Sequence, residues 1–209
     1  MRFASAAPYA VCAYCRSLLV RRDAGLESLG RVAAVPEDFS PLQLGTSGEF
    51  DRRPFTLVGR IRKVWSEGSW NEWCAHFGDG SLGWLAEAQG DLVMTFERGA
   101  ATMRPPLGAS TATDLMPASF VALDGQRFQV SDIKEVACAG AEGELASYAA
   151  DTGPMTCIDL RGPGLAFATI ERSDALRLFV GRYVEFAECR FSHLKPMDGW
   201  TLGSSPPAR

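Results

Sequence analysis

A short tryptophan-rich segment around a Gly-Asp-Gly turn constrains the fold of this chain more than any other feature. Four of the five tryptophans lie within residues 65–84. On both sides of the turn, apolar residues alternate with polar or small ones, which is the period of a half-buried β-strand. Gly78 and Gly80 can adopt the positive φ angles that a tight turn requires. The residues from Trp73 to Trp84 are therefore predicted to form a β-hairpin.

The alternation divides the first strand of this hairpin into two faces. Trp73 and Phe77 share one face, and Glu72, Cys74 and His76 share the other. A catalytic pair of Cys74 and His76 is therefore geometrically possible. The favoured interpretation is that Cys74 is a small buried hydrophobic residue, because the chain has only two histidines and catalytic bases are scarce. We therefore assign no catalytic residue.

A fainter copy of the hairpin pattern occurs in the second half of the chain. Residues 128–136 match residues 55–64, and the copy needs a longer connection over 140–153. We infer two β-meander units of related design, packed as a sandwich or barrel-like pair, so the fold class is mainly β. The matched hairpin positions are Cys157 with Cys74, Leu160 with Phe77, and Phe167 with Trp84.

One short helix is expected in the second half, over residues 173–181. Ser173 has the character of an N-cap, and Gly181 has that of a C-terminal stop. Between the two halves, prolines, glycines and small residues without periodicity indicate a linker. The predicted organisation is a partial zinc-ribbon knuckle with its connector at 1–34, a first β repeat at 36–98, a linker loop at 99–119, a second β repeat at 120–202 and a flexible tail at 203–209.

Composition and charge narrow the classes of function. The net charge is −4 and the pI is about 5.3, whereas nucleic-acid binding usually needs a basic surface. No nucleic-acid partner is therefore expected. No apolar run approaches the roughly 18 residues of a membrane span, so no direct membrane span is expected. The N-terminus lacks the pattern of a signal peptide, and six scattered cysteines are too few for a disulfide scaffold, so we expect a cytoplasmic protein.

Several charged residues are assigned to solvent or to turns. The basic run from Arg60 to Lys63 includes an apolar residue and is interpreted as the solvated face of a strand. Asp79 and Asp159 are expected at turns, where aspartate is common for backbone reasons. No glycine-rich phosphate loop or dinucleotide fingerprint is present.

Cys12 and Cys15 have the spacing of a zinc knuckle, in which two thiolates bind one metal ion from a tight turn. A closed zinc site needs four ligands, and the chain contains no second close pair of cysteines. Zinc binding would then require an assembly, or an extension upstream, that supplies the missing ligands. The alternatives are a vestigial knuckle with free thiols and, less favoured, a redox pair without the usual strand–helix context.

Three segments in this order resemble an uncharacterised bacterial family, numbered 4178 among the domains of unknown function. They are Gly59-Arg60, Trp70-Asn71-Glu72-Trp73 and Trp84-Leu85, and residues 158–184 look like a companion copy. The resemblance covers most of residues 40–200. It implies an N-terminal zinc ribbon of two knuckles, of which only Cys12 and Cys15 are present here, and it implies no catalytic activity.

The favoured hypothesis is a non-enzymatic cytoplasmic binding or adaptor module. Its partner would be a protein, a second copy of the chain or a small cationic ligand. For the cationic ligand, the candidate binding residues are Trp70, Glu72, Trp73 and His76, with Glu72 as the counter-charge. The competing interpretation of these residues is purely structural, with Trp73 and Trp84 in the core and Trp70 capping an edge.

The alternative function is an enzyme, or an enzyme subunit, that acts on a polyamine-like small molecule. Genes of the resembling family tend to lie near aminopropyltransferase-like enzymes, which is the reason to name this substrate class. The alternative places Glu72, His76 and Asp79 close to one site. It predicts that Trp70, Glu72 and His76 line an open pocket.

Overall fold

Two four-stranded antiparallel meanders dominate the computed structural model, which describes residues 3–22, 25–99, 103–104, 115–147, 154–173 and 175–197. The predicted hairpin from Trp73 to Trp84 is present, with its turn at 78–80. The first meander consists of β5 (Arg53–Trp65), β6 (Gly68–Phe77), β7 (Leu82–Ala88) and β8 (Asp91–Arg98). The second consists of β11 (Gln126–Leu145), β12 (Met155–Arg161), β13 (Ala166–Arg172) and β14 (Leu176–Val184).

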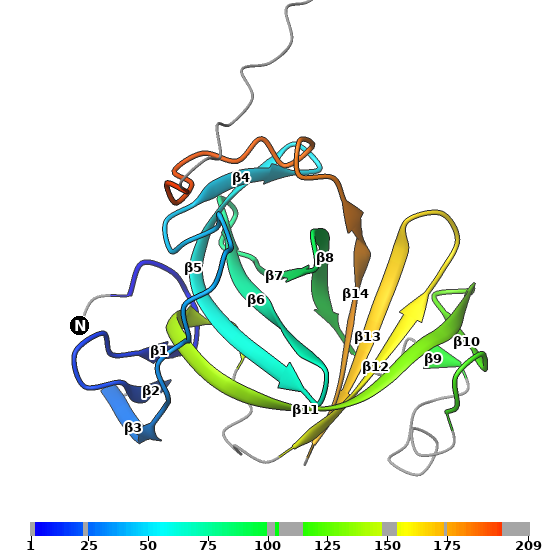
Figure 1. Cartoon of the computed structure of the whole chain (residues 1–209), viewed down its shortest axis with the longest axis horizontal. Helices are drawn as coiled ribbons and strands as arrows, with labels where there is room; N and C mark the ends of the chain where they lie inside the picture. Colours follow the sequence, from blue (N-terminus) through cyan, green and yellow to red (C-terminus); the bar gives the residue numbers. More distant parts are fainter. Residues whose placement is uncertain are drawn as a thin grey trace, which may run out of the picture.

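The two meanders close on each other to form a barrel. Strand β8 pairs with β14 and strand β5 pairs with β11, both in antiparallel fashion. The order around the ring is therefore β5-β6-β7-β8-β14-β13-β12-β11 and back to β5 (Figure 1). The prediction of a mainly β fold built from two related meanders is confirmed, and its barrel-like form is the one observed.

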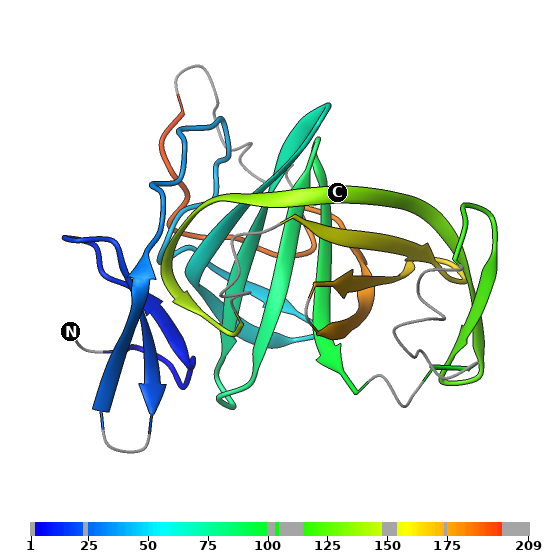
Figure 2. The same cartoon turned by 90° about the horizontal axis from the view of Figure 1, so that it is seen from below.

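Strand β11 closes the ring because it is long enough to pair with both meanders. The strand has 20 residues. Its part from Gln129 to Val136 pairs with β12, and its part from Ala137 to Gly143 pairs with β5. Figure 2 shows this strand curving along the whole barrel. The connection expected over 140–153 is therefore wrong for its first residues, which continue the strand to Leu145.

The short helix expected at 173–181 is wrong, because residues 176–181 belong to strand β14 instead. Both edges of β14 are occupied, one by β13 and the other by β8. Leu178 and Phe179 are both buried, on opposite faces of the strand, which a strand between two partners allows. Tertiary pairing thus outweighs the local helix signals, and Gly181 does not end the element.

Each of the two seams between the meanders depends on a glycine. A Cβ atom at Gly59 of β5 would lie 1.9 Å from the backbone oxygen of Glu144. A Cβ atom at Gly181 of β14 would lie 1.8 Å from the backbone oxygen of Met94. Both distances are far below contact, so a side chain at either position would force the paired strands apart. The two glycines explain how the meanders approach closely enough to close the ring.

Short segments outside the ring cover its apolar outer surface. The first meander is covered by β4 (Ser47–Phe50) and by residues 184–194, and the second by β10 (Phe120–Leu123). Strand β9 (Met103–Arg104) pairs with β10. At the other end of β11, a small sheet consists of β1 (Tyr9–Val11), β2 (Ser17–Arg22) and β3 (Gly25–Arg31).

The predicted linker and tail fall largely beyond the part of the chain that can be described. Residues 100–102 and 105–114 of the linker, and all of the tail at 203–209, lie outside the described residues. Within the described ranges, no helix is long and apolar enough to cross a membrane.

Candidate ligand-binding cavity

A cavity of about 430 Å³ occupies the interior of the barrel. All eight strands contribute to its wall, because alternate residues of each strand point into the ring. Ligand pockets commonly have volumes of roughly 300–1,000 Å³, so this one is large enough for a small organic molecule. Six aromatic side chains lie in the wall: Trp65, Trp70, Trp84, Phe167, Phe179 and Tyr183.

One part of the interior is filled by apolar side chains. Ile61, Cys74, Trp84 and Phe179 pack together there. Burial raises the pKa of the Cys74 thiol to about 12, so this cysteine is a neutral thiol at physiological pH. The cavity therefore has an apolar floor, and Cys74 takes the structural role that the sequence favoured.

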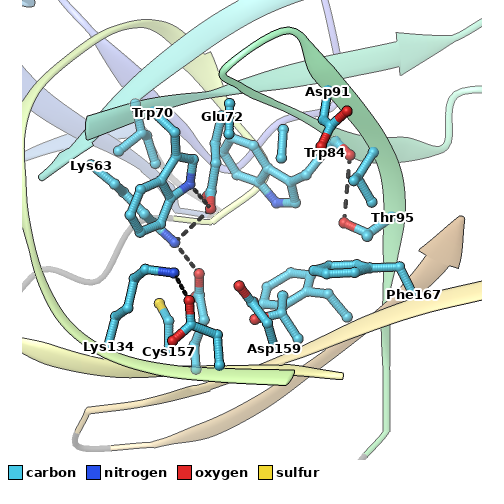
Figure 3. A pocket seen from close by; sticks show the side chains of 18 of the residues that line it. Lys63, Trp70, Glu72, Trp84, Asp91, Thr95, Lys134, Cys157, Asp159 and Phe167 are labelled. Carbon is cyan, nitrogen blue, oxygen red and sulfur yellow. Dashed lines mark hydrogen bonds and ion pairs between the residues drawn. The ribbon is translucent and has the colours of Figure 1, made fainter. Parts of the chain in front are cut away.

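A lysine held between two glutamates lies in the polar part of the wall. Lys63 Nζ lies 2.9 Å from Glu72 Oε1 and also forms an ion pair with Glu171 (Figure 3). The Lys63 side chain is only 3% exposed. Burial alone would lower the pKa of Lys63, but Glu171 and Glu72 together outweigh it and hold that pKa well above its usual range. Lys63 therefore keeps its positive charge at physiological pH.

Glu72 is tied to the aromatic wall as well as to Lys63. Trp70 Nε1 donates a hydrogen bond to Glu72 Oε1 at 3.1 Å, and the rings of Trp65 and Trp70 lie 5.4 Å apart. Burial is the main reason that the pKa of Glu72 is raised, with Glu171 nearby adding to the effect and Lys63 opposing it. Glu72 consequently holds a proton more readily than an exposed glutamate does.

A second lysine of the wall also combines a carboxylate with an indole ring. Lys134 forms an ion pair with Asp132, two residues earlier on β11. Its Nζ lies 5.3 Å from the centroid of the Trp65 ring. The cavity wall thus brings carboxylates and aromatic faces together around ammonium groups at two places.

Asp159 of β12 differs from Glu72, Asp132 and Glu171 of the wall, because no described cation forms an ion pair with its side chain. Figure 3 shows its carboxyl group pointing into the cavity on the side of Phe167. Burial raises its pKa, although a hydrogen bond with Thr169 of the paired strand β13 opposes that shift. Asp159 is therefore a buried carboxyl group directed at open space.

The Trp-Asn-Glu-Trp motif is divided between the two faces of β6. Trp70 and Glu72 line the cavity, whereas Asn71 and Trp73 point outward. Trp73 Nε1 donates to Glu87 Oε2 at 3.0 Å. Asn71 Nδ2 donates to the same oxygen at 3.1 Å, and to Asp38 Oδ2 at 2.7 Å. The outward half of the motif therefore fastens the segment around Asp38 onto the barrel.

The structure brings together only part of the predicted ligand-binding set. Trp70 and Glu72 line the cavity, but Trp73 belongs to the outer core beneath the covering segments. His76 is half-buried further along β6 and does not line the cavity. Asp79 lies on the β6–β7 turn, where Arg53 Nη2 donates to its Oδ2 at 2.7 Å. Glu72, His76 and Asp79 thus do not form one site.

Sequence reasoning missed Lys63, Lys134, Asp159 and Glu171 as cavity residues. The run from Arg60 to Lys63 is not a solvated face, since Lys63 points inward and is almost fully buried. Asp159 is not a turn residue, since it lies within β12. The available signal was the alternation along β12, where Asp159 is flanked on both sides by buried apolar residues.

Cys12 and Cys15 lie on the tight turn between β1 and β2. Cys15 is exposed, and its Sγ lies 3.1 Å from Ser17 Oγ. Hydrogen bonds with the Ser17 side chain and backbone, and with Cys12, lower the pKa of the Cys15 thiol to about 7. In the described part of the chain, no group of three or more histidine, cysteine or acidic residues is placed to hold a metal ion. The two thiols by themselves are fewer than the four ligands of a closed zinc site, and zinc binding at this turn stays a prediction.

The fold and the cavity define the class: a mainly β barrel protein with an internal, ligand-sized cavity walled by aromatic and charged residues. The chain belongs to the family described as a domain of unknown function, DUF4178, whose model matches residues 43–186. This range contains all eight strands of the barrel. No curated protein and no solved structure matches the chain.

Proposed function

We propose that this protein is a non-enzymatic binding module that holds a small cationic ligand inside the barrel. The observation that carries the proposal is the enclosure of three carboxyl groups with aromatic rings in one cavity. Glu72, Asp159 and Glu171 share the wall with Trp70 and Trp84. Buried carboxylates favour a nearby positive charge, and aromatic faces attract cations through the ring quadrupole.

The protein's own lysines indicate the kind of group that this wall accommodates. Lys63 Nζ lies 5.9 Å from the Trp70 ring centroid while it contacts two carboxylates. Lys134 has the same combination of an indole and a carboxylate. An ammonium group on a ligand would meet the same chemistry at Asp159, which has no cation of its own among the described residues.

Three probes of the same size test the sign of the ligand charge. Benzylamine, benzyl alcohol and benzoate are titrated into the full chain, with calorimetry and tryptophan fluorescence as readouts. We expect saturable binding of benzylamine and no binding of benzoate, because a carboxylate would repel the acidic wall. Glu72→Gln should weaken benzylamine binding. Benzoate binding as tightly as benzylamine, or no binding of the amine at all, would overturn the proposal.

A matched control separates the cavity from charge effects elsewhere. Asp79 is an exposed carboxylate on the β6–β7 turn, bonded to Arg53 and Ser81. Asp79→Asn removes one negative charge, as Glu72→Gln does, but leaves the cavity unchanged. We expect benzylamine affinity to be unaffected by this substitution. Equal weakening by both variants would mean that the amine responds only to net charge.

The other parts of the sequence hypothesis stay predictions. The enzyme alternative needed Glu72, His76 and Asp79 at one site, and these residues lie apart. A protein partner or second copy remains a prediction, because an assembly would supply the ligands that Cys12 and Cys15 lack. Native mass spectrometry tests it: one zinc per two chains, lost together with the dimer in Cys12→Ser, would support it, and a metal-free monomer would contradict it.

A further inference from the structure

The charges in the enclosed part of the cavity do not balance. Lys134 and Asp132 neutralise each other. The remaining inward groups are the carboxyls of Glu72, Glu171 and Asp159, with Lys63 as their only cation among the described residues. Three carboxyl groups and one ammonium group leave two negative charges without a partner when all three carboxyls are ionised.

The charged residues at the rim do not correct this imbalance. Arg177 is engaged by Glu97 outside the cavity, with Nη2 2.7 Å from Oε2. Arg161 is exposed, and its guanidinium lies 4.7 Å from the Tyr183 ring centroid. Asp91 is exposed and adds a further negative charge. The deficit of positive charge is therefore a property of the enclosed wall.

Burial raises the pKa of both Glu72 and Asp159, so both groups take up protons more readily than exposed carboxyls do. The groups that act on Asp159 from neighbouring elements are Thr169, Lys134, Asp132, Lys63 and Tyr183. Buried carboxyl groups without a paired cation are unfavourable in a purely structural wall, which would be more stable with apolar residues.

We propose, resting on the cation-binding function above, that the ligand is a small organic molecule with two ammonium groups. One ammonium group binds Asp159. The other joins Lys63 at the Glu72–Glu171 pair. The body of the ligand lies against the aromatic wall formed by Trp70, Trp84 and Phe167.

An organic dication fits this wall better than a divalent metal ion does. Calcium and magnesium need several oxygen ligands converging on one point, and the described residues contain no such group. Indole and phenyl rings offer metal ions no suitable ligand but cover a hydrocarbon frame well.

Two probes that differ in a single ammonium group test the charge of the ligand. Para-xylylenediamine and 4-methylbenzylamine have the same frame, and both are titrated into the full chain by calorimetry. We expect the diamine to bind at least about tenfold more tightly, because its second ammonium group adds a charge-assisted hydrogen bond. Equal affinities would overturn the dication inference while cation binding stands. Failure of both amines would instead overturn the proposed function.

Proton release and one pair of variants test where the two ammonium groups of the ligand bind. Glu72 and Asp159 must be ionised to bind the two ammonium groups. Calorimetry in buffers of different ionisation enthalpy should therefore show that protons are released when the diamine binds. For the same reason, the diamine affinity should fall as the pH falls. Asp159→Asn should reduce the diamine affinity to that of the monoamine. Glu135 is an exposed carboxylate outside the cavity, so Glu135→Gln should change neither the diamine affinity nor the monoamine affinity. Binding without proton release, or calcium chloride displacing the diamine, would contradict the inference.

Discussion

Lys63 of β5 and Glu171 of β13 form an ion pair inside the barrel, although 108 residues separate them in the sequence. The pair joins the two meanders from within, while the β5–β11 and β8–β14 ladders join them along the wall. Folding of the second meander alone would leave Glu171 without Lys63, whereas Lys63 would keep only Glu72 in the first. Closure of the barrel and completion of its polar interior are therefore coupled.

Removing Lys63 should be strongly destabilising. Lys63→Met leaves Glu72 and Glu171 buried together without a cation, and breaking a buried ion pair in this way costs about 3–5 kcal/mol of unfolding free energy. Urea denaturation followed by circular dichroism measures the loss. Lys195→Met, at an exposed lysine, is the matched control and should change stability by less than about 0.5 kcal/mol. A similarly small effect of Lys63→Met would show that the pair does not hold the barrel together.

Asp159 should make the stability of the ligand-free protein fall as the pH rises. Its pKa is raised in the folded state, so the folded protein binds this proton more tightly than the unfolded chain does. The stabilisation is present at low pH and is lost as the pH rises from the unfolded pKa of about 3.9 through the folded value. We expect Asp159→Asn to be more stable than the wild type at pH 7.

The comparison of thermal unfolding at several pH values tests the sign of this effect. The advantage of Asp159→Asn should shrink as the pH falls, because protonation then makes the wild-type carboxyl group neutral as well. Asp79 is the opposite control, because hydrogen bonds with Ser81 and Arg53 lower its pKa to about 2. Asp79→Asn should therefore give no advantage at pH 7. An Asp159→Asn variant that is less stable than the wild type at neutral pH would refute the prediction.

Cys15 should be the most reactive cysteine of the folded protein at neutral pH. Its pKa of about 7 makes a large fraction thiolate, whereas burial raises the pKa of Cys74 to about 12 and that of Cys189 to about 11. Mass spectrometry after a short treatment with iodoacetamide should locate the first label on Cys15. Ser17→Ala should slow the labelling at pH 7, since it removes the hydrogen bond to the thiolate. Labelling of Cys74 before Cys15 in the native protein would contradict the placement of both residues.

Gly181→Ala should weaken the seam between the meanders. The new Cβ would lie 1.8 Å from the backbone oxygen of Met94, so strands β14 and β8 must separate, at a cost of about 1–3 kcal/mol or more. Gly78→Ala is the matched control, because its Cβ would meet only Pro54 at 3.9 Å. Chemical denaturation should distinguish the two variants. If Gly181→Ala is as stable as Gly78→Ala, the β8–β14 seam does not require close approach.

The elements that sequence reasoning predicted correctly are those encoded by neighbouring residues. The strand alternation around Trp73 and Trp84 and the turn at 78–80 need only local information. The match between Cys74 and Cys157 also held, because both side chains face the barrel interior. A period of two is visible in any short window, so the hairpins and their faces follow from it.

The errors concern residues whose state depends on distant partners. The segment at 173–181 carries local helix signals, but β8 and β13 flank its residues 176–181 and hold them extended. Lys63 resembles a surface lysine until Glu72 and Glu171 are brought to it. No window of sequence contains both members of such a pair, so the inward direction of a charge is not recognisable locally.

By itself, the sequence determined two related β-meanders, their tight turns and the division of each strand into two faces, because strand periodicity and turn chemistry act over a few residues. Only the tertiary structure decided that the meanders close into one barrel through β11 and β14, and that Lys63, Glu72, Glu171 and Asp159 meet inside it. The physical reason is that ring closure, burial of charge and the resulting pKa shifts are properties of contacts between residues far apart in the chain.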